Sequence, residues 1–158
     1  MADQPVFGIA TAEDFARLGG LDLLRGMMEG TIPAPPIAGP LRFRLVEAEE
    51  GRAVFECDPD GSLLNPLGIV HGGVALTLID SAAGCAVHTT LGPGTGYTSV
   101  ETKVNFTRPV KPDGGTLRCE GKVVTRGRQI ATAEAVLMDD KGRIVSHGTS
   151  TLMIFAAR

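Results

Sequence analysis

The chain has 158 residues, which suits one domain with a sizeable core, and its formal net charge of −3 argues against a general nucleic-acid-binding role. Its three cysteines are widely spaced, with no CxxC pair and no zinc-ligand spacing, so free thiols in a reducing compartment are expected. The first residues lack a basic segment followed by an apolar run, so no signal peptide is predicted. Together these features predict a soluble, cytoplasmic protein with no metal site.

The first part of the chain, residues 1–40, is expected to pack on a domain formed by residues 41–158. Thr11 can cap a helix, and the apolar residues after it form a face that a Gly-Gly pair interrupts. One amphipathic helix or two short ones are therefore predicted. Residues 30–40 contain four prolines and are expected to form an extended connector.

Six stretches alternate apolar and polar residues and are predicted as antiparallel strands. A Glu-Glu-Gly turn joins the first two into a hairpin. The alternation of the third predicts Ser99 and Glu101 on one face and Val100, Thr102, Val104 and Phe106 on the other. The predicted strands are residues 41–47, 52–57, 97–106, 117–125, 129–138 and 144–155.

Between the second and third strands, residues 72–91 are apolar or small on nearly every side. A helix that is hydrophobic all round is a buried helix, and this one is too interrupted by Gly and Thr for a confident membrane span. Six strands and one buried helix predict an α+β fold in which a curved antiparallel sheet wraps around a central helix. The other face of the sheet would meet a partner subunit or solvent.

Asp80 is the only formally charged side chain of that helix. A carboxylate is rarely buried without a partner, because removing it from water is costly. Asp80 is therefore either paired with backbone or side-chain donors in a structural role, or placed for chemistry.

The loop before the helix reads Asn65-x-x-Gly68-x-x-His71-Gly72-Gly73, and Asp80 follows eight residues after Gly72. This pattern resembles the hotdog-fold acyl-CoA thioesterases of the phenylacetate-degradation (PaaI-like) type. The similarity extends over about residues 41–155, through Ser99-Val100-Glu101, Asn105 to Pro109, Gly127-Arg128 and Asp140-Lys141-Gly142. The resemblance implies a hotdog fold, and a homodimer that forms the active site and is usually paired into a tetramer.

The resemblance also implies roles for four catalytic residues. The Gly72 N–H would polarise the thioester carbonyl, and Asp80 would act as general base or nucleophile. Asn65 would hold the carbonyl or the water, and Ser99 would position the water. The simpler alternatives are a tight turn at Gly72, an Asx turn at Asn65 and an ordinary polar strand position at Ser99.

The remaining candidates concern substrate binding. His71 and Gly73 belong to the loop before the helix, residues 65–73, which is called the glycine loop below. His71 is expected to form a hydrogen bond with the backbone of this loop and so to hold Gly72 in position. Basic residues near turns are candidates for the coenzyme A phosphates, although ordinary solvated side chains are an equal alternative. These residues are Arg108, Lys111, Arg126 and Arg128. His88 is expected to complement the negative end of the helix.

No cofactor is expected, because coenzyme A would be part of the substrate. Two other functions stay open. One is a hotdog hydratase or dehydratase, which needs a paired histidine and carboxylate for proton transfer at carbon. The other is an acyl-CoA-binding module without catalysis. The sequence leaves the acyl group open between aryl, short and medium chains.

Overall fold

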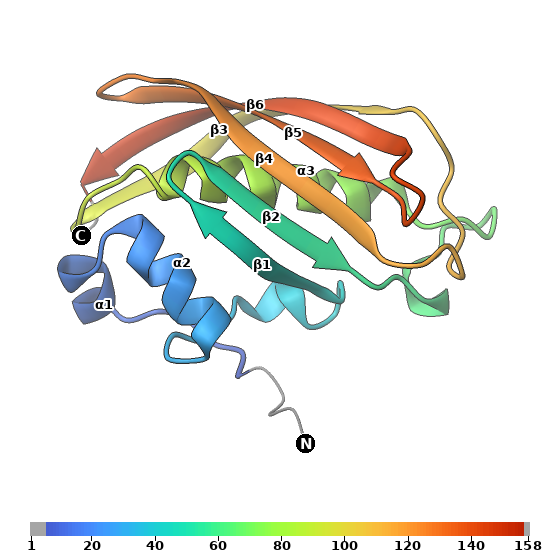
Figure 1. Cartoon of the computed structure of the whole chain (residues 1–158), viewed down its shortest axis with the longest axis horizontal. Coiled ribbons are helices and arrows are strands. Elements are labelled where there is room, and N and C mark those ends of the chain that lie inside the picture. The colour runs from blue at the N-terminus through green and yellow to red at the C-terminus, as the bar shows by residue number, and fades with distance from the viewer. Residues whose placement is uncertain (1–5, 157–158) are drawn as a thin grey trace.

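A six-stranded antiparallel sheet curves around one long helix in the computed structural model, which describes residues 6–156 (Figure 1). The hotdog fold predicted above is therefore confirmed. The helices are α1 (Ala12–Arg17), α2 (Gly20–Glu29) and α3 (Gly72–His88), with short 3-10 turns at Pro36–Ala38 and Gly61–Leu63. The strands are β1 (Phe43–Glu49), β2 (Arg52–Cys57), β3 (Thr95–Phe106), β4 (Leu117–Arg126), β5 (Ile130–Met138) and β6 (Ile144–Ala156).

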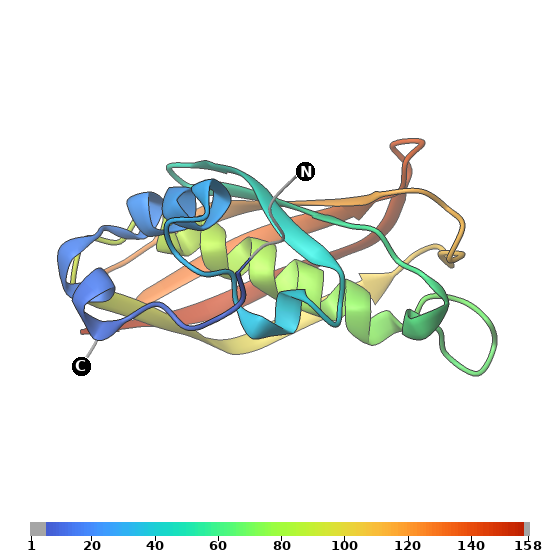
Figure 2. The same ribbon diagram turned by 90° about the horizontal axis from the view of Figure 1, so that it is seen from below.

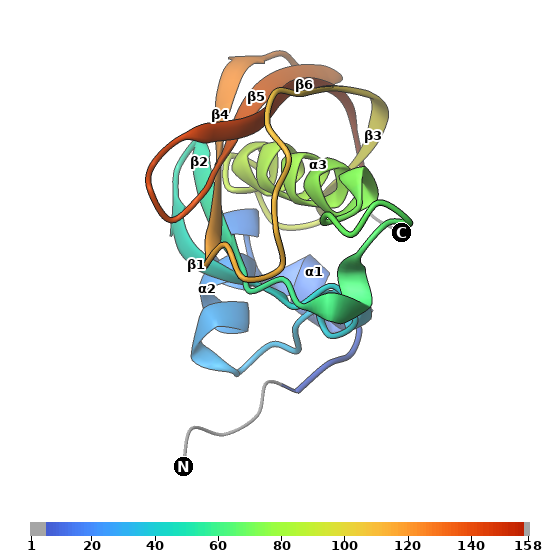
Figure 3. The same cartoon turned by 90° about the vertical axis from the view of Figure 1, so that its right-hand side faces the viewer.

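The strands lie in the order β1-β2-β4-β5-β6-β3, so β1 and β3 are the two edges of the sheet. The end-on view shows the sheet arching over α3, and every strand contacts this helix (Figure 3). The first strand begins two residues later than predicted because Arg42 has a left-handed backbone (φ 54°), which an extended strand cannot contain. The helix ends at His88, three residues earlier than predicted.

Small side chains allow the helix to lie close to the sheet. Three alanines of β5 (Ala131, Ala133 and Ala135) are buried. On β4, a Cβ at Gly121 would come within 2.2 Å of the carbonyl oxygen of Ala82 in α3, so only glycine allows this approach. The protein has no tryptophan and few aromatic residues, and its core is accordingly built from aliphatic side chains and alanine.

The long helix is covered unevenly. Nine of its residues are buried, but Leu76 near its N-terminal end is 40% exposed. The expectation that α3 is buried on all sides is wrong there, because the sheet covers one side and α2 contacts only part of the other. Seen from below, the first turns of α3 lie open beside the glycine loop (Figure 2). Within residues 6–156, no helix combines the length and apolarity needed to cross a membrane.

The N-terminal segment forms two short helices rather than one. Thr11 and Asp14 make a reciprocal capping box at the start of α1, as expected for a threonine cap. The chain then turns extended at Leu18 and Gly19, which separates α1 from α2. Helix α2 is tied to the end of α3 by a bond from the Gly20 N–H to the Leu91 carbonyl (2.9 Å).

Candidate functional site

The loop that precedes α3 is organised by Asn65. Its Oδ1 accepts hydrogen bonds from the N–H groups of Leu67 (2.9 Å) and Ile69 (3.3 Å), and its own N–H donates to the Ile69 carbonyl (2.8 Å). This is the Asx-turn arrangement that was the simpler alternative for Asn65. The side-chain oxygen is thus occupied by the loop, and the Nδ2 amide is the group left for a ligand.

His71 is the N-cap of α3. Its Nδ1 accepts a hydrogen bond from the Gly73 N–H (2.8 Å), and its carbonyl accepts from the Val74 N–H (2.9 Å). The Gly72 N–H between them has no acceptor within residues 6–156 and lies at the positive end of the helix dipole. Gly72 lines a pocket of about 340 Å³ together with Asn65, Phe106 and Arg108. The geometry therefore presents one free backbone donor to this pocket, with His71 in the loop-bonding position expected for it.

Asp80 lies in the middle of α3 and points toward β3. Its Oδ1 accepts hydrogen bonds from the hydroxyls of Ser99 (2.8 Å) and Thr102 (2.8 Å). Its Oδ2 has no hydrogen bond, and neither oxygen has a Lys, Arg or His partner, among residues 6–156. Asp80 is thus a half-buried carboxylate held by hydroxyls alone, with one oxygen open.

A β-bulge in β3 makes this arrangement possible. Ser99 pairs with Leu152 and Glu101 pairs with Thr151, so Val100 is an extra residue without a partner on β6. The bulge turns Ser99 and Thr102 to the same inner face, whereas the strict alternation predicted above put Ser99 beside Glu101. That prediction is wrong, and it is why Thr102 was missed as a site residue.

A further hydroxyl fixes Thr102. The Oγ of Ser150 on β6 lies 3.0 Å from the Oγ1 of Thr102 and 3.0 Å from the Glu101 carbonyl oxygen. Ser150 is 1% exposed, so its orientation is set by these neighbours rather than by water. The carboxylate of Asp80 is therefore supported by two layers of hydroxyl groups.

The basic residues predicted to bind phosphates are not close together. Arg108 lies beside the start of β6, where its N–H donates to the Val145 carbonyl (3.3 Å), whereas Gln129, in the turn with Arg126 and Arg128, bonds to Ile154. About nine residues of β6 separate these points, roughly 30 Å at the rise of a strand. Arg108 and the turn that holds Arg126 and Arg128 therefore lie at opposite ends of the sheet, as successive turns of an antiparallel sheet do.

A second pocket of about 440 Å³ adjoins the glycine-loop pocket, and Arg108 lines both. Lys111, as well as Lys141 and Arg143 from the hairpin between β5 and β6, lines this second pocket. Arg143 is held by Asp139 at 2.7 Å. Lys141 was not among the predicted site residues, and the sequence marked it only as part of a turn.

Other reactive side chains near Asp80 are poorly suited to chemistry. Burial raises the pKa of Cys85 to about 12, so its thiol stays protonated. Burial lowers the pKa of His88, so the expected role as a cation at the helix end is wrong. No group of three metal-ligating side chains occurs within residues 6–156. No histidine bonds to Asp80 there, so the pair that a hydratase needs is not found in this part of the chain.

A comparison with models of known protein families identifies the family of this chain. The model of the Thioesterase superfamily matches residues 67–146, which contain the end of the glycine loop, α3, β3, β4, β5 and the start of β6. The chain belongs to this superfamily. Membership supports thioester hydrolysis as the class of reaction, as the resemblance implied.

Several solved structures are similar to this chain in fold. The chain is 27% identical to a phenylacetic acid degradation-related protein of Ralstonia eutropha JMP134, with a TM-score of 0.76 over 83% of this chain and 98% of that one. It is 25% identical to a Streptococcus mutans UA159 protein solved with acetyl-CoA bound, with a TM-score of 0.67 over 73% and 90%. The PaaI protein of E. coli shares the fold at 20% identity, with a TM-score of 0.76 over 88% and 95%.

Proposed function

We propose that this protein hydrolyses acyl-CoA thioesters to a free acid and coenzyme A, at a site built from two copies of the chain. The observation that carries this proposal is Asp80, a carboxylate with one oxygen held by two hydroxyls and the other without a hydrogen bond from any of residues 6–156. A carboxylate without a cationic partner keeps its lone pairs available to a water molecule or a carbonyl carbon.

In the proposed reaction the Gly72 N–H binds the carbonyl oxygen and stabilises the oxyanion that forms when the carbonyl is attacked. Asp80 either removes a proton from the attacking water or attacks the carbonyl itself. The carbon–sulfur bond then breaks, and coenzyme A leaves as a thiolate that takes up a proton. Because a thiol has a pKa near 8.5, the leaving group needs no strong general acid.

The distance between Gly72 and Asp80 along α3 is the reason why the proposed active site needs two copies of the chain. Gly72 and Asp80 are eight residues apart, about 12 Å along a helix axis, so they cannot both touch one carbonyl group. In the described part of the chain the edge strand β3 pairs with β6 alone, and its Val100 and Phe106 are 56% and 60% exposed. A second copy that pairs along this edge would bring its own Asp80 toward the Gly72 pocket. The tetramer implied by the resemblance stays a prediction.

The coenzyme A moiety is proposed to extend from the glycine-loop pocket into the adjoining pocket of about 440 Å³, which four basic and three acidic side chains line. Arg108 connects the two, and Lys111 and Lys141 can meet phosphate oxygens as point charges. The Streptococcus mutans neighbour with bound acetyl-CoA supports a ligand of this class.

The backbone donor can be tested by a matched pair of variants. Gly72 is the first residue of α3, a position that tolerates proline, and the extended backbone of His71 suits a following proline. Gly72→Pro removes the N–H, whereas Gly72→Ala keeps it, and both add a Cβ that would lie 3.2 Å from the Phe106 ring. Thiol release from octanoyl-CoA should fall about 10²- to 10³-fold in Gly72→Pro relative to Gly72→Ala. Equal rates in the two folded variants would remove Gly72 from the mechanism.

The two-copy site can be tested by mixing inactive chains. When Gly72→Pro and Asp80→Asn are co-expressed, a mixed dimer holds one site with an intact Gly72 from one copy and an intact Asp80 from the other. Random pairing should restore about a quarter of wild-type activity, because half of the dimers are mixed and each has one intact site. No recovery in verified mixed dimers would show that both groups act within one chain.

A further inference from the structure

An apolar pocket of about 770 Å³ lies between the N-terminal helices and the C-terminal half of α3. The chain has only seven aromatic residues besides histidine, and six of them line this pocket; Phe106 is the exception. Leu23, Leu24 and Met27 of α2 complete much of its wall. A pocket of this size and lining suits the hydrophobic part of a small molecule. The six aromatic residues are Phe7, Phe15, Phe43, Phe55, Tyr97 and Phe155.

Two side chains with nitrogen atoms, Arg44 and His88, interrupt this apolar wall. Arg44 is paired with Glu56 (2.8 Å) and Asp58 (2.5 Å), so His88 is the one considered as a partner for an occupant. His88 lines the pocket and is only 7% exposed. Its ring lies 6.3 Å from that of Phe15, stacked, and 5.3 Å from that of Tyr97, tilted. Within residues 6–156 its ring nitrogens have no hydrogen-bond partner, yet neither is sealed from the surrounding space. A neutral imidazole offers one donor and one acceptor, and neither is used by another residue of the range 6–156.

Asp80 does not line this pocket, but it lies on the same side of α3 as His88, which does. Asp80, Gly84 and His88 follow one another at four-residue intervals on α3, on the side that faces β3. Tyr97 packs against Gly84, where a Cβ would come within 2.8 Å of the phenol oxygen, and it shares the inner face of β3 with Ser99. His88 is therefore about 12 Å along the helix axis from Asp80.

Building on the hydrolysis proposed above, we propose that this pocket receives the acyl group and that His88 selects acyl groups with a hydroxyl far from the thioester. A plain hydrocarbon chain that filled the pocket would displace water from His88 and leave the imidazole without a partner. Such an unpaired buried group costs free energy, whereas a distal hydroxyl would restore the lost hydrogen bond. The aromatic wall binds the carbon skeleton in both cases, so His88 determines the difference between them.

The test compares two substrates that differ by one oxygen, octanoyl-CoA and 8-hydroxyoctanoyl-CoA. Wild-type kcat/KM should be about 5- to 10-fold higher for the hydroxylated ester, the usual effect of one buried hydrogen bond. In His88→Phe, which keeps a ring between Phe15 and Tyr97, the preference should disappear while octanoyl-CoA is still hydrolysed. Equal rates in the wild type, or a preference that survives in His88→Phe, would overturn the inference but leave the proposed function intact. Hydrolysis of neither ester by folded wild-type protein would instead overturn the proposed function, and the inference with it.

A second measurement does not depend on the folding of His88→Phe. In Asp80→Asn protein labelled with ¹⁵N-histidine, the His88 ring signals should shift with 8-hydroxyoctanoyl-CoA in a way that octanoyl-CoA does not reproduce. Identical shifts with both esters would show that the hydroxyl does not reach His88.

Discussion

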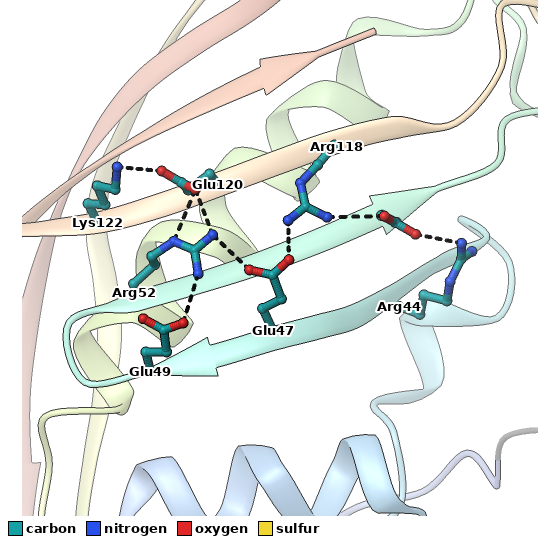
Figure 4. Close-up of polar contacts among 8 residues, drawn as sticks. Arg44, Glu47, Glu49, Arg52, Arg118, Glu120 and Lys122 are labelled. Carbon is teal, nitrogen blue, oxygen red and sulfur yellow. Dashed lines mark hydrogen bonds and ion pairs between the residues drawn. The ribbon is translucent and has the colours of Figure 1, made fainter. Parts of the chain in front are cut away.

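Two groups of carboxylates in this protein have opposite surroundings. On the outer face of β1, β2 and β4, Glu47 contacts both Arg118 and Arg52, and Glu120 contacts Arg52 (2.8 Å) and Lys122 (2.5 Å) (Figure 4). On the inner side of the sheet, the hydrogen bonds that Asp80 receives from residues 6–156 come only from Ser99 and Thr102. Glu47 and Glu120 each contact two cationic side chains, whereas Asp80 contacts none among residues 6–156.

The difference separates a structural carboxylate from a reactive one. The cations around Glu47 and Glu120 occupy their lone pairs and lower their pKa values, Arg118 contributing most at Glu47 and Lys122 at Glu120. Such groups stabilise the sheet and make poor bases or nucleophiles. Neutral hydroxyls orient Asp80 through one oxygen and leave the other free, which suits a group that must accept a proton or form a bond.

The largest expected effect comes from removing the charge of Asp80. Asp80→Asn should lower kcat for octanoyl-CoA by about 10²- to 10⁴-fold, because the amide can neither accept a proton nor attack a carbonyl. Thiol release measures the loss, while circular dichroism and size-exclusion chromatography check the fold and assembly. Glu120→Gln is the matched control and should retain wild-type activity. If the Asp80→Asn protein were fully active, Asp80 would not differ in function from the carboxylates of the outer face, Glu47 and Glu120.

A smaller effect is expected from the hydroxyls that hold Asp80. Ser99→Ala and Thr102→Val should each reduce kcat about 10-fold with little change in KM, because they disturb the orientation of Asp80 rather than the binding of substrate. Thr102→Ser should recover most of the activity, since it restores the hydroxyl. Ser146→Ala is the control, because this hydroxyl bonds to the Asn105 carbonyl at 2.9 Å, away from Asp80. If Ser146→Ala lost as much activity as Thr102→Val, the hydroxyls would matter only for packing.

Much of the fold was predictable because hydrophobic periodicity reports which faces are buried. Strand alternation and an apolar helix defined the sheet and its centre, and Asp80 was conspicuous as the one charge on that helix. Thr102 was not predictable in this way. The bulge at Val100 depends on how β3 pairs with β6, and alternation along β3 alone carries no mark of it.

The positions of the arginines and the burial of His88 differ in how far the sequence could predict them, each for its own physical reason. Arg108 and Arg128 follow successive strands of an antiparallel sheet, so their position at opposite ends could have been worked out from the strand order alone. The burial of His88 could not have been predicted from the sequence in this way. It depends on α1 and α2, which lie more than fifty residues earlier in the chain and fold back over His88. Local sequence shows a histidine at a helix end, and only the tertiary packing shows that burial opposes its charge.

The smallest expected effect is on the stability contributed by the outer face. Because the folded-state pKa of Glu120 is lowered, its ion pairs should stabilise the protein above the unfolded-state pKa near 4.3 and lose that contribution as pH falls through the folded value. Glu120→Gln should therefore lower the free energy of unfolding by about 0.5–1 kcal/mol at pH 7, the range for partly exposed pairs.

The difference between Glu120→Gln and the wild type should shrink as the pH falls through the lowered folded-state pKa of the wild-type carboxyl, which then becomes protonated. Urea unfolding at pH 3, 5 and 7 measures it, and added salt should reduce it at pH 7 because exposed charges are screened. A difference that stayed constant with pH and salt would mean that Glu120 stabilises the sheet by packing. The contrast with Asp80 would then rest on burial rather than on neutralisation by cations.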